Sequence, residues 1–211
     1  MNIAGIRKEY IKHSLDAVAV GSNPVAFFLG WLDEAFNAGV LEPTAMAVSS
    51  VSEDGRPSSR IVLLKGTEDG KFTFFTNYNS RKGREINTNS EVALLFFWPE
   101  LERQVRVEGI AIRVSEEESD AYFNSRPLES RIGAVASPQS TVISGRKTLE
   151  ELYNMIAEKT ILEGIVRPEN WGGFTVIPHT VEFWQGRPGR LHDRIRFRSE
   201  GNEWIKERLA P

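Results

Sequence analysis

The chain has 211 residues, with 26 Lys or Arg against 29 Asp or Glu, so its formal net charge is −3. This balance argues against a nucleic-acid-binding protein that works through bulk positive charge. The absence of cysteine excludes disulfides, thiolate catalysis and cysteine-based zinc sites. The three histidines lie far apart and form no His-x-x-x-His pair, so we expect no metal site.

The apolar segments of the chain are short. The longest, 92–98, is far below the roughly 20 residues that a membrane-spanning helix needs. The first ten residues carry charge and contain no apolar signal-peptide core. We therefore expect a cytoplasmic protein that has neither a membrane nor a nucleic acid as its partner.

Taken in order, the chain predicts one helix followed mainly by strands. Residues 1–22 are mixed and polar and predict an N-terminal arm, whereas 23–211 contain no linker and predict a single domain. Asn23 and Pro24 are typical of an N-cap and a first helical position, and apolar residues then repeat at helical spacing to about residue 38. Further helices are predicted at 81–89, 116–125 and 148–162, and strands at 45–51, 58–65, 72–76, 92–98, 104–114, 174–177, 180–185, 194–198 and 203–208. This order favours an α+β fold, an antiparallel β-barrel with flanking helices.

Two predicted elements carry cations that suit phosphate. Strand alternation places Arg60 and Lys65 on opposite faces, one at each end of an apolar run. They are either snorkelling strand ends or cations placed between two anions. Arg81 and Lys82 follow the predicted N-cap Ser80, where positive side chains oppose the helix dipole. A bound phosphate would resolve that conflict. The alternative is an ordinary helix N-terminus that binds no ligand.

A third cluster comprises Tyr122, Arg126 and Ser130, spaced by four. If the helix continues past Pro127 with a kink, the three side chains share one face and form a cradle for a second phosphate. The alternative is an arginine at a helix end beside a surface serine.

The segment 190–194 follows a Gly/Pro turn and alternates charge. An extended backbone would place Arg190, His192 and Arg194 on one face, where an anionic or electron-rich ligand would relieve their repulsion. The alternative is a solvated edge strand. Trp184, in the preceding strand, either stacks on a ligand or fills the core. Two phosphorylated small molecules in one site would account for all these clusters.

Eight segments together resemble the pyridoxamine 5′-phosphate oxidase family. They are RIVLLK at 60–65, SRK at 80–82, LERQV at 101–105, SRP at 125–127, WGGF at 171–174, VEFWQG at 181–186, RLHDR at 190–194 and RLAP at 208–211. The resemblance covers nearly the whole chain from about residue 7, and the 190–194 segment is the most specific.

The resemblance implies an FMN-binding split β-barrel that works as a homodimer with FMN at the subunit interface. It implies oxidation of pyridoxamine 5′-phosphate or pyridoxine 5′-phosphate to pyridoxal 5′-phosphate, by hydride transfer to flavin N5. Dioxygen then reoxidises the flavin and yields hydrogen peroxide, in vitamin B6 biosynthesis and salvage.

The resemblance also implies roles for individual residues. Arg190 and His192 are the expected catalytic pair. The expected FMN contacts are Arg60, Ile61, Val62, Leu63, Leu64, Lys65, Phe75, Thr76, Arg81, Lys82, Gln104, Gln139, Ser140, Trp184 and Arg194. The expected substrate contacts are Arg7, Tyr10, Lys65, Tyr122, Arg126, Ser130, Arg190, Leu191 and His192, with the 1–22 arm closing over the substrate. Phe75 stands where a tyrosine is common in the family, so a backbone contact to FMN would survive there, whereas a hydroxyl contact would be lost.

Two other functions fit parts of this pattern. A split-barrel FMN reductase that uses NAD(P)H would share the flavin residues but would not need Tyr122, Arg126 and Ser130. A non-enzymatic protein that binds pyridoxal 5′-phosphate would need no flavin.

Overall fold

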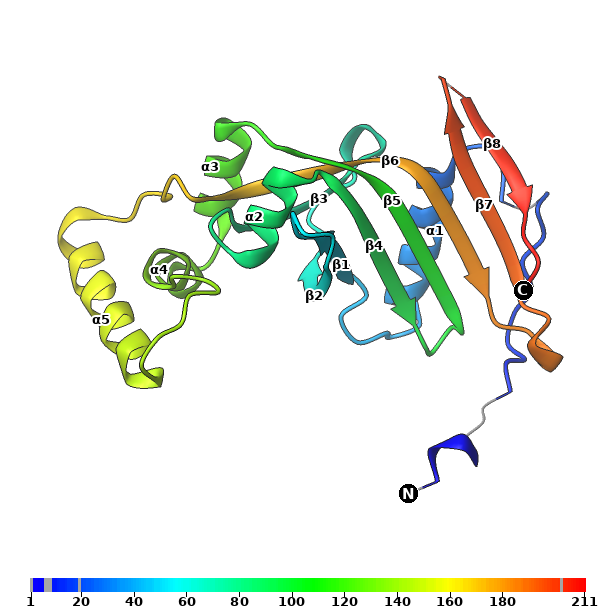
Figure 1. Ribbon diagram of the computed structural model, residues 1–211, viewed down its shortest axis with the longest axis horizontal. Helices are drawn as coiled ribbons and strands as arrows, with labels where there is room; N and C mark the ends of the chain where they lie inside the picture. Colours follow the sequence, from blue (N-terminus) through cyan, green and yellow to red (C-terminus); the bar gives the residue numbers. More distant parts are fainter. Residues whose placement is uncertain (1, 6–8, 19, 202) are drawn as a thin grey trace.

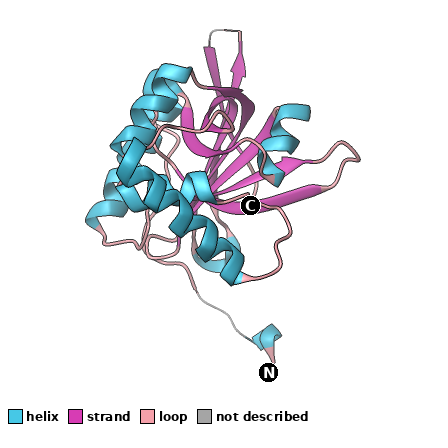
Figure 2. Ribbon diagram, turned by 90° about the vertical axis from the view of Figure 1, so that its left-hand side faces the viewer, coloured by secondary structure: helices cyan, strands magenta, loops and turns pink. Residues whose placement is uncertain are grey.

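An antiparallel sheet organises the computed structural model, which describes residues 2–5, 9–18, 20–201 and 203–211 (Figure 1). The strands are β1 (Ala45–Val51), β2 (Pro57–Leu63), β3 (Phe72–Asn77), β4 (Glu91–Trp98), β5 (Arg103–Arg113), β6 (Trp171–Gln185), β7 (Asp193–Glu200) and β8 (Glu203–Arg208). The helices are α1 (Pro24–Asn37), α2 (Arg81–Thr88), α3 (Glu116–Ser125), α4 (Leu128–Ala136) and α5 (Arg146–Glu163), with 3₁₀ turns η1 (Ile3–Gly5), η2 (Glu68–Gly70) and η3 (Pro188–Arg190). Most of the helices lie on one side of the strands (Figure 2).

The sheet curls back on itself without closing completely. Seven strands follow the order β2-β1-β4-β5-β6-β7-β8, and β3 pairs with the first part of β6. A single bridge between Gly66 and Thr73 joins the chain after β2 to β3. This arrangement confirms the predicted α+β class and the antiparallel split β-barrel with flanking helices.

Helix α1 packs its apolar face into the barrel. The Asn23 side chain accepts the N–H groups of Val25 (3.0 Å) and Ala26 (3.1 Å), as predicted for the N-cap. Phe28 is fully buried and its ring lies 4.8 Å from that of Phe96, measured between centroids. Leu15, in the predicted arm, is buried in the same apolar core.

Strand β6 corrects one prediction. Residues 174–177 and 180–185 were expected to form two strands, but they belong to one strand of 15 residues. A register shift opposite Glu108 and Gly109 keeps the strand continuous past Pro178, whose missing N–H would otherwise break the ladder. Gly109 is required at this bulge because a Cβ there would lie 2.2 Å from the carbonyl oxygen of Ile177.

The length of β6 sets the layout of the molecule. Helices α3, α4 and α5 gather at its first end, and the β7–β8 hairpin lies at its other end (Figure 1). Among the described residues, no helix combines the length and the apolar character required to cross a membrane.

Candidate functional site

A cavity of about 690 Å³ opens between β2, β3 and helices α3 and α4. Its volume lies within the range of small-molecule sites. Predicted FMN or substrate contacts make up much of its lining, namely Ile61, Val62, Leu63, Lys65, Phe75, Thr76, Lys82, Tyr122, Arg126, Ser130 and Gln139. Residues far apart in the sequence therefore meet around one cavity.

Strand β2 alternates as predicted. Arg60 and Val62 are partly buried, whereas Ile61 and Leu63 are exposed. The strand ends at Leu63, earlier than expected, because the following backbone turns to pair with β3 through the Lys65 N–H and the Thr73 carbonyl (2.8 Å). Lys65 is thereby placed at the rim of the cavity.

The start of α2 supplies a buried cation. Ser80 is the N-cap, and its hydroxyl accepts the N–H of Gly83 (3.2 Å). The Lys82 ammonium donates to Thr76 Oγ1 (2.9 Å) and Gln139 Oε1 (3.3 Å). Burial, and to a smaller degree the charge of Arg60, lowers the pKa of Lys82 to about 8. A buried ammonium held by neutral oxygens favours an anionic ligand.

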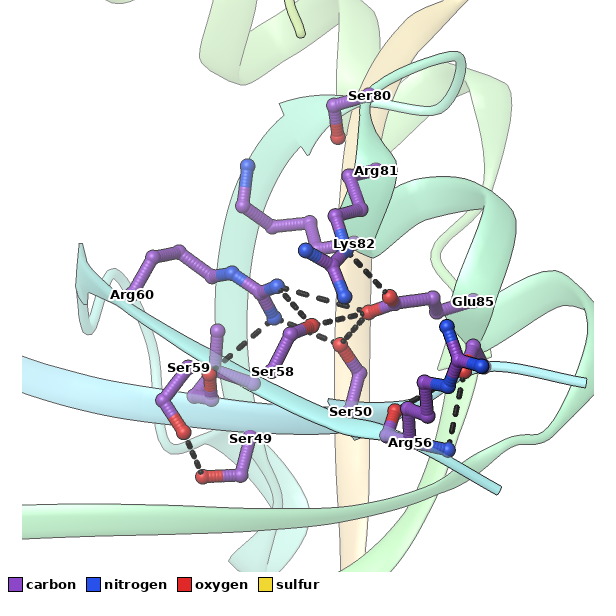
Figure 3. A network of polar contacts seen from close by, with 12 residues as sticks. Ser49, Ser50, Arg56, Ser58, Ser59, Arg60, Ser80, Arg81, Lys82 and Glu85 are labelled. Carbon is purple, nitrogen blue, oxygen red and sulfur yellow. Dashed lines mark hydrogen bonds and ion pairs between the residues drawn. The ribbon is translucent and has the colours of Figure 1, made fainter. Parts of the chain in front are cut away.

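One buried carboxylate, Glu85, organises the neighbouring cations (Figure 3). Its oxygens accept hydrogen bonds from Ser50 Oγ (2.6 Å), Ser58 Oγ (2.5 Å) and Arg81 Nε (2.8 Å). The Arg60 guanidinium in turn donates to both serine hydroxyls, at 2.6 and 2.5 Å. These contacts align two predicted FMN contacts from different elements, Arg60 and Arg81.

Glu85 was not identified as a functional residue from the sequence. The spacing of four between Arg81 and Glu85 was a usable signal, because such pairs are neighbours on a helix. The serines could not be placed, since their convergence depends on the pairing of Ser50 with Ser58 across β1 and β2. The conflict between Arg81 and the helix dipole is therefore relieved in part by the protein itself.

Replacing Glu85 with glutamine is expected to weaken the acid sensitivity of the fold. Although burial alone would raise it, the hydrogen bonds from the serines and Arg81 lower the pKa of Glu85 from 4.5 to about 2. The carboxylate therefore stabilises the native state fully above its unfolded-state pKa, and this contribution is lost as pH falls from about 4.5 toward 2. Urea unfolding of wild type and Glu85→Gln between pH 7 and pH 2 measures the difference, which should be about 2 kcal/mol at neutral pH and should shrink at low pH. A difference independent of pH would contradict this assignment.

The third predicted cluster assembles, although not through one helix. Helix α3 ends at Ser125, Arg126 has extended backbone angles, and α4 begins at Leu128. The helix predicted at 116–125 is confirmed, and the kinked continuation considered for this cluster does not form, because the residue before a proline is driven away from helical geometry. Tyr122, Arg126 and Ser130 nevertheless all line the cavity, each positioned by a different part of this turn.

Arg126 has unused donors. Its guanidinium carbon lies 4.8 Å from the ring centroid of Trp171. Its Nη1 is buried and has no hydrogen-bond partner among the described residues. Burial lowers the pKa of Arg126, yet an arginine remains charged at neutral pH. A charged donor left in this state is suited to an incoming anion.

Phe75 forms part of an aromatic stack. Its ring lies 3.9 Å from that of Tyr122 and 5.6 Å from that of Trp171, in both cases nearly parallel. The absence of a hydroxyl at this position therefore leaves the packing of the cavity wall intact.

A second cluster lies at the other end of β6. Gln104, Trp184 and Arg194 are directly paired across β5, β6 and β7. The rings of Trp184 and His192 are 4.7 Å apart, and Tyr10 packs its edge on both, at 5.6 and 5.7 Å. Trp184 thus belongs to a polar-aromatic surface and is only partly buried.

Arg190, His192 and Arg194 were expected to share one face of an extended segment, and this expectation is wrong for Arg190. Arg190 belongs to η3 and has a φ of 61°, following Gly189 at 64°. This left-handed turn replaces the extended backbone that the expectation required. Leu191 is 73% exposed and follows the same turn.

Arg194 and His192 have specific protein partners. Arg194 Nε donates to Glu182 Oε1 (2.8 Å), and its Nη1 donates to the carbonyl of Ala210 (2.8 Å). Glu182 is buried and was missed from the sequence, although it lies two residues before Trp184 on the same face. The Arg187 N–H donates to His192 Nδ1 (3.1 Å), so the neutral ring carries its proton on Nε2. Burial, and secondarily Arg190, lowers the pKa of His192.

One chain does not bring the two clusters together. Trp171 lines the cavity and Trp184 belongs to the second cluster, and they stand near opposite ends of β6. At about 3.3 Å per residue, that separation is roughly 40 Å. Of the remaining predicted contacts, Arg7 lies outside the described residues and Ser140 is exposed, with a φ of 68°.

Comparison with known proteins identifies relatives along the whole chain. Residues 32–151 match the family model described as pyridoxamine 5′-phosphate oxidase, and residues 171–211 match the pyridoxine 5′-phosphate oxidase C-terminal dimerisation region. A pyridoxine/pyridoxamine 5′-phosphate oxidase of Haemophilus influenzae (strain 86-028NP) is 54% identical over 211 residues, covering 100% of both chains. One from Leptospira biflexa is 48% identical over 210 residues, covering 100% of this chain and 99% of the relative.

Solved structures agree with this result. PhzG from Burkholderia lata 383, in complex with tetrahydrophenazine-1-carboxylic acid, has a TM-score of 0.89 and 30% identity, covering 95% of this chain and 99% of that one. A pyridoxamine 5′-phosphate oxidase-related, FMN binding protein from Nostoc punctiforme has a TM-score of 0.70 at 17% identity, covering 86% of this chain and 96% of that one, which supports the fold alone. The extent of the sequence matches shows that the chain belongs to the pyridoxamine 5′-phosphate oxidase family.

Proposed function

We propose that this protein oxidises pyridoxine 5′-phosphate, or pyridoxamine 5′-phosphate with water and release of ammonia, to pyridoxal 5′-phosphate, with FMN as its cofactor and dioxygen as the final acceptor. The observation that carries the proposal is the unpartnered, buried Nη1 of Arg126 beside Tyr122 and Ser130 in the cavity. A charged donor without a partner costs free energy unless a ligand satisfies it. A phosphate monoester supplies the required charge and several acceptor oxygens.

Lys82 in the cavity lining, together with Arg60 and Arg81 next to lining residues in the chain, fits FMN. Lys82 is a buried cation with neutral partners, and Arg81 is held by Glu85 through Nε while its two terminal nitrogens take no part in hydrogen bonds among the described residues. We assign these cations, together with Arg60, to the FMN phosphate, and the backbone of 61–63 to the flavin ring. Bound FMN would supply the redox chemistry, accepting two electrons from the substrate and passing them to dioxygen to give hydrogen peroxide.

The active site in this proposal needs two copies of the chain. A strand of about 40 Å separates Trp184, His192 and Arg194 from the cavity of their own chain. The match of residues 171–211 to a dimerisation region supports a homodimer. We place FMN at the interface, where the second cluster of one protomer completes the cavity of the other.

The side chains would then act by holding and orienting the substrate. Lys65, Tyr122, Arg126 and Ser130 anchor the phosphate, which fixes one end of the molecule. Neutral His192 offers the proton on Nε2 to a ring substituent, because Nδ1 is already occupied by the Arg187 N–H. Arg190 steers the reacting carbon, and such fixed geometry supplies much of the rate.

The visible spectrum of the purified protein tests the proposal. We expect a bound flavin absorbance that bleaches when pyridoxamine 5′-phosphate is added without oxygen, and that returns on aeration with release of hydrogen peroxide. A flavin that bleaches only with NAD(P)H would identify the reductase instead. A colourless protein that binds pyridoxal 5′-phosphate would favour the non-enzymatic binder.

A further inference from the structure

The N-terminal segment is held by a carboxylate that the mechanism does not use. Glu102, in the turn between β4 and β5, is only 2% exposed. Its Oε2 accepts the backbone N–H groups of Ile11 (2.9 Å) and Lys12 (3.1 Å), about 90 positions earlier in the sequence. Two amide donors from one segment thus converge on one buried oxygen.

Glu102 is itself fixed to the second cluster. Its backbone carbonyl accepts the N–H of Gly186 (2.8 Å) and Nε2 of Gln185 (3.2 Å). Gln185 and Gly186 directly follow Trp184 at the end of β6. The position of the carboxylate is therefore tied to the position of the tryptophan.

The Tyr10 ring packs against Gly186 at the end of β6. The ring contacts Trp184 and His192 edge-on, with interplanar angles of 89° and 72°. A Cβ on Gly186 would lie 2.6 Å from Tyr10 Cγ, so the tyrosine lies directly against the glycine backbone. Because Tyr10 immediately precedes Ile11, the two hydrogen bonds to Glu102 fix the backbone next to its ring.

The buried Glu102 carboxylate stabilises the docked position of the N-terminal segment. Every hydrogen bond that the Glu102 carboxylate makes among the described residues goes to Ile11 or Lys12. Undocking the segment would leave a buried carboxylate without donors, which is costly. A second carboxylate, Asp193, accepts the N–H of Leu15 (3.0 Å) and keeps the following turn in place.

We infer that Glu102 is a positioning residue that latches segment 9–16 so that Tyr10 covers Trp184 and His192. Glu102 touches neither of the two rings and acts through Tyr10. The inference rests on the proposed function in placing these rings beside the substrate. It assigns Glu102 to the closing of the site over bound substrate, and not to the chemical step.

The test compares Glu102→Ala, Glu102→Gln and Tyr10→Ala with wild type, as FMN-loaded dimers. We expect Glu102→Ala to raise KM for pyridoxamine 5′-phosphate about tenfold, with kcat within about twofold and FMN affinity unchanged, because the latch contributes to binding in both ground and transition states. Glu102→Gln keeps one acceptor oxygen and should recover much of the loss. The KM of the double variant Glu102→Ala/Tyr10→Ala should not exceed that of the single variant with the higher KM, because both changes remove the same contact.

A second readout needs no activity. Trypsin cleavage after Lys12 should be at least tenfold faster in Glu102→Ala than in wild type, since the docked backbone is protected. Glu100→Gln, an exposed neighbour in the same turn, is the matched control and should change neither readout. Unchanged cleavage in Glu102→Ala would overturn the latch, and so would additive losses in the double variant. A wild type that fails to oxidise pyridoxamine 5′-phosphate would overturn the proposed function, while the cleavage comparison would still decide the latch.

Discussion

Replacing Arg190 with alanine should lower kcat by about 100- to 1000-fold while FMN stays bound, because misplacing a reacting group costs rates of that order. The structure makes this a clean substitution. Arg190 is exposed, and its side chain makes no hydrogen bond to another described residue. Its loss therefore removes a cation from beside His192 and Leu191 without removing a contact that stabilises the fold.

The measurement is single-turnover bleaching of the flavin with saturating pyridoxamine 5′-phosphate, together with an FMN titration. Arg198→Ala is a suitable control, since it removes an exposed cation on β7 whose ion pair with Glu200 is long, at 3.7 Å. Turnover close to wild type in Arg190→Ala would remove Arg190 from the catalytic pair. Loss of FMN would instead make it a cofactor contact.

Local structure was predictable wherever neighbouring residues determine it. The side chains of Asn23 and Ser80 cap helices as expected, because each signal is complete within four residues. The alternation in β2 was equally readable. The errors arose where a backbone choice depends on a distant partner, as at Pro178, where pairing with β5 through a bulge preserves a strand that the proline should end.

The site was predictable in part. The spacing of four grouped Tyr122, Arg126 and Ser130, and all three line one cavity, although two helices and a turn bring them there and not one kinked helix. The counter-ions were missed. Glu182 meets Arg194 through strand register, and Glu85 meets Arg60 through packing, although the spacing of four between Arg81 and Glu85 was a usable signal. The left-handed conformation of Arg190 could not be predicted from the residue type, because positive φ angles are rare for an arginine.

Replacing Arg126 with alanine should raise KM for pyridoxamine 5′-phosphate by about 30- to 100-fold and change kcat little. A hydrogen bond to a charged group is worth roughly 1.5–3 kcal/mol, and a phosphate anchor acts equally on substrate and transition state. The fold should tolerate the change, because Nη1 has no partner among the described residues to lose and the guanidinium stacks on Trp171 at 4.8 Å. Steady-state kinetics and an FMN titration on the same preparation separate the two sites.

Two further variants sharpen the test. Arg126→Lys keeps the charge but loses the planar pair of donors, so it should recover part of the affinity and no more. Arg113→Ala removes a comparable stacked arginine, 4.1 Å above the Tyr78 ring, from a residue that does not line the cavity, and should leave KM unchanged. If Arg126→Ala released FMN and left KM unaltered, the two phosphate positions would have to be exchanged. Lys82 would then be the substrate anchor, and its pKa of about 8 would make KM rise as pH passes that value.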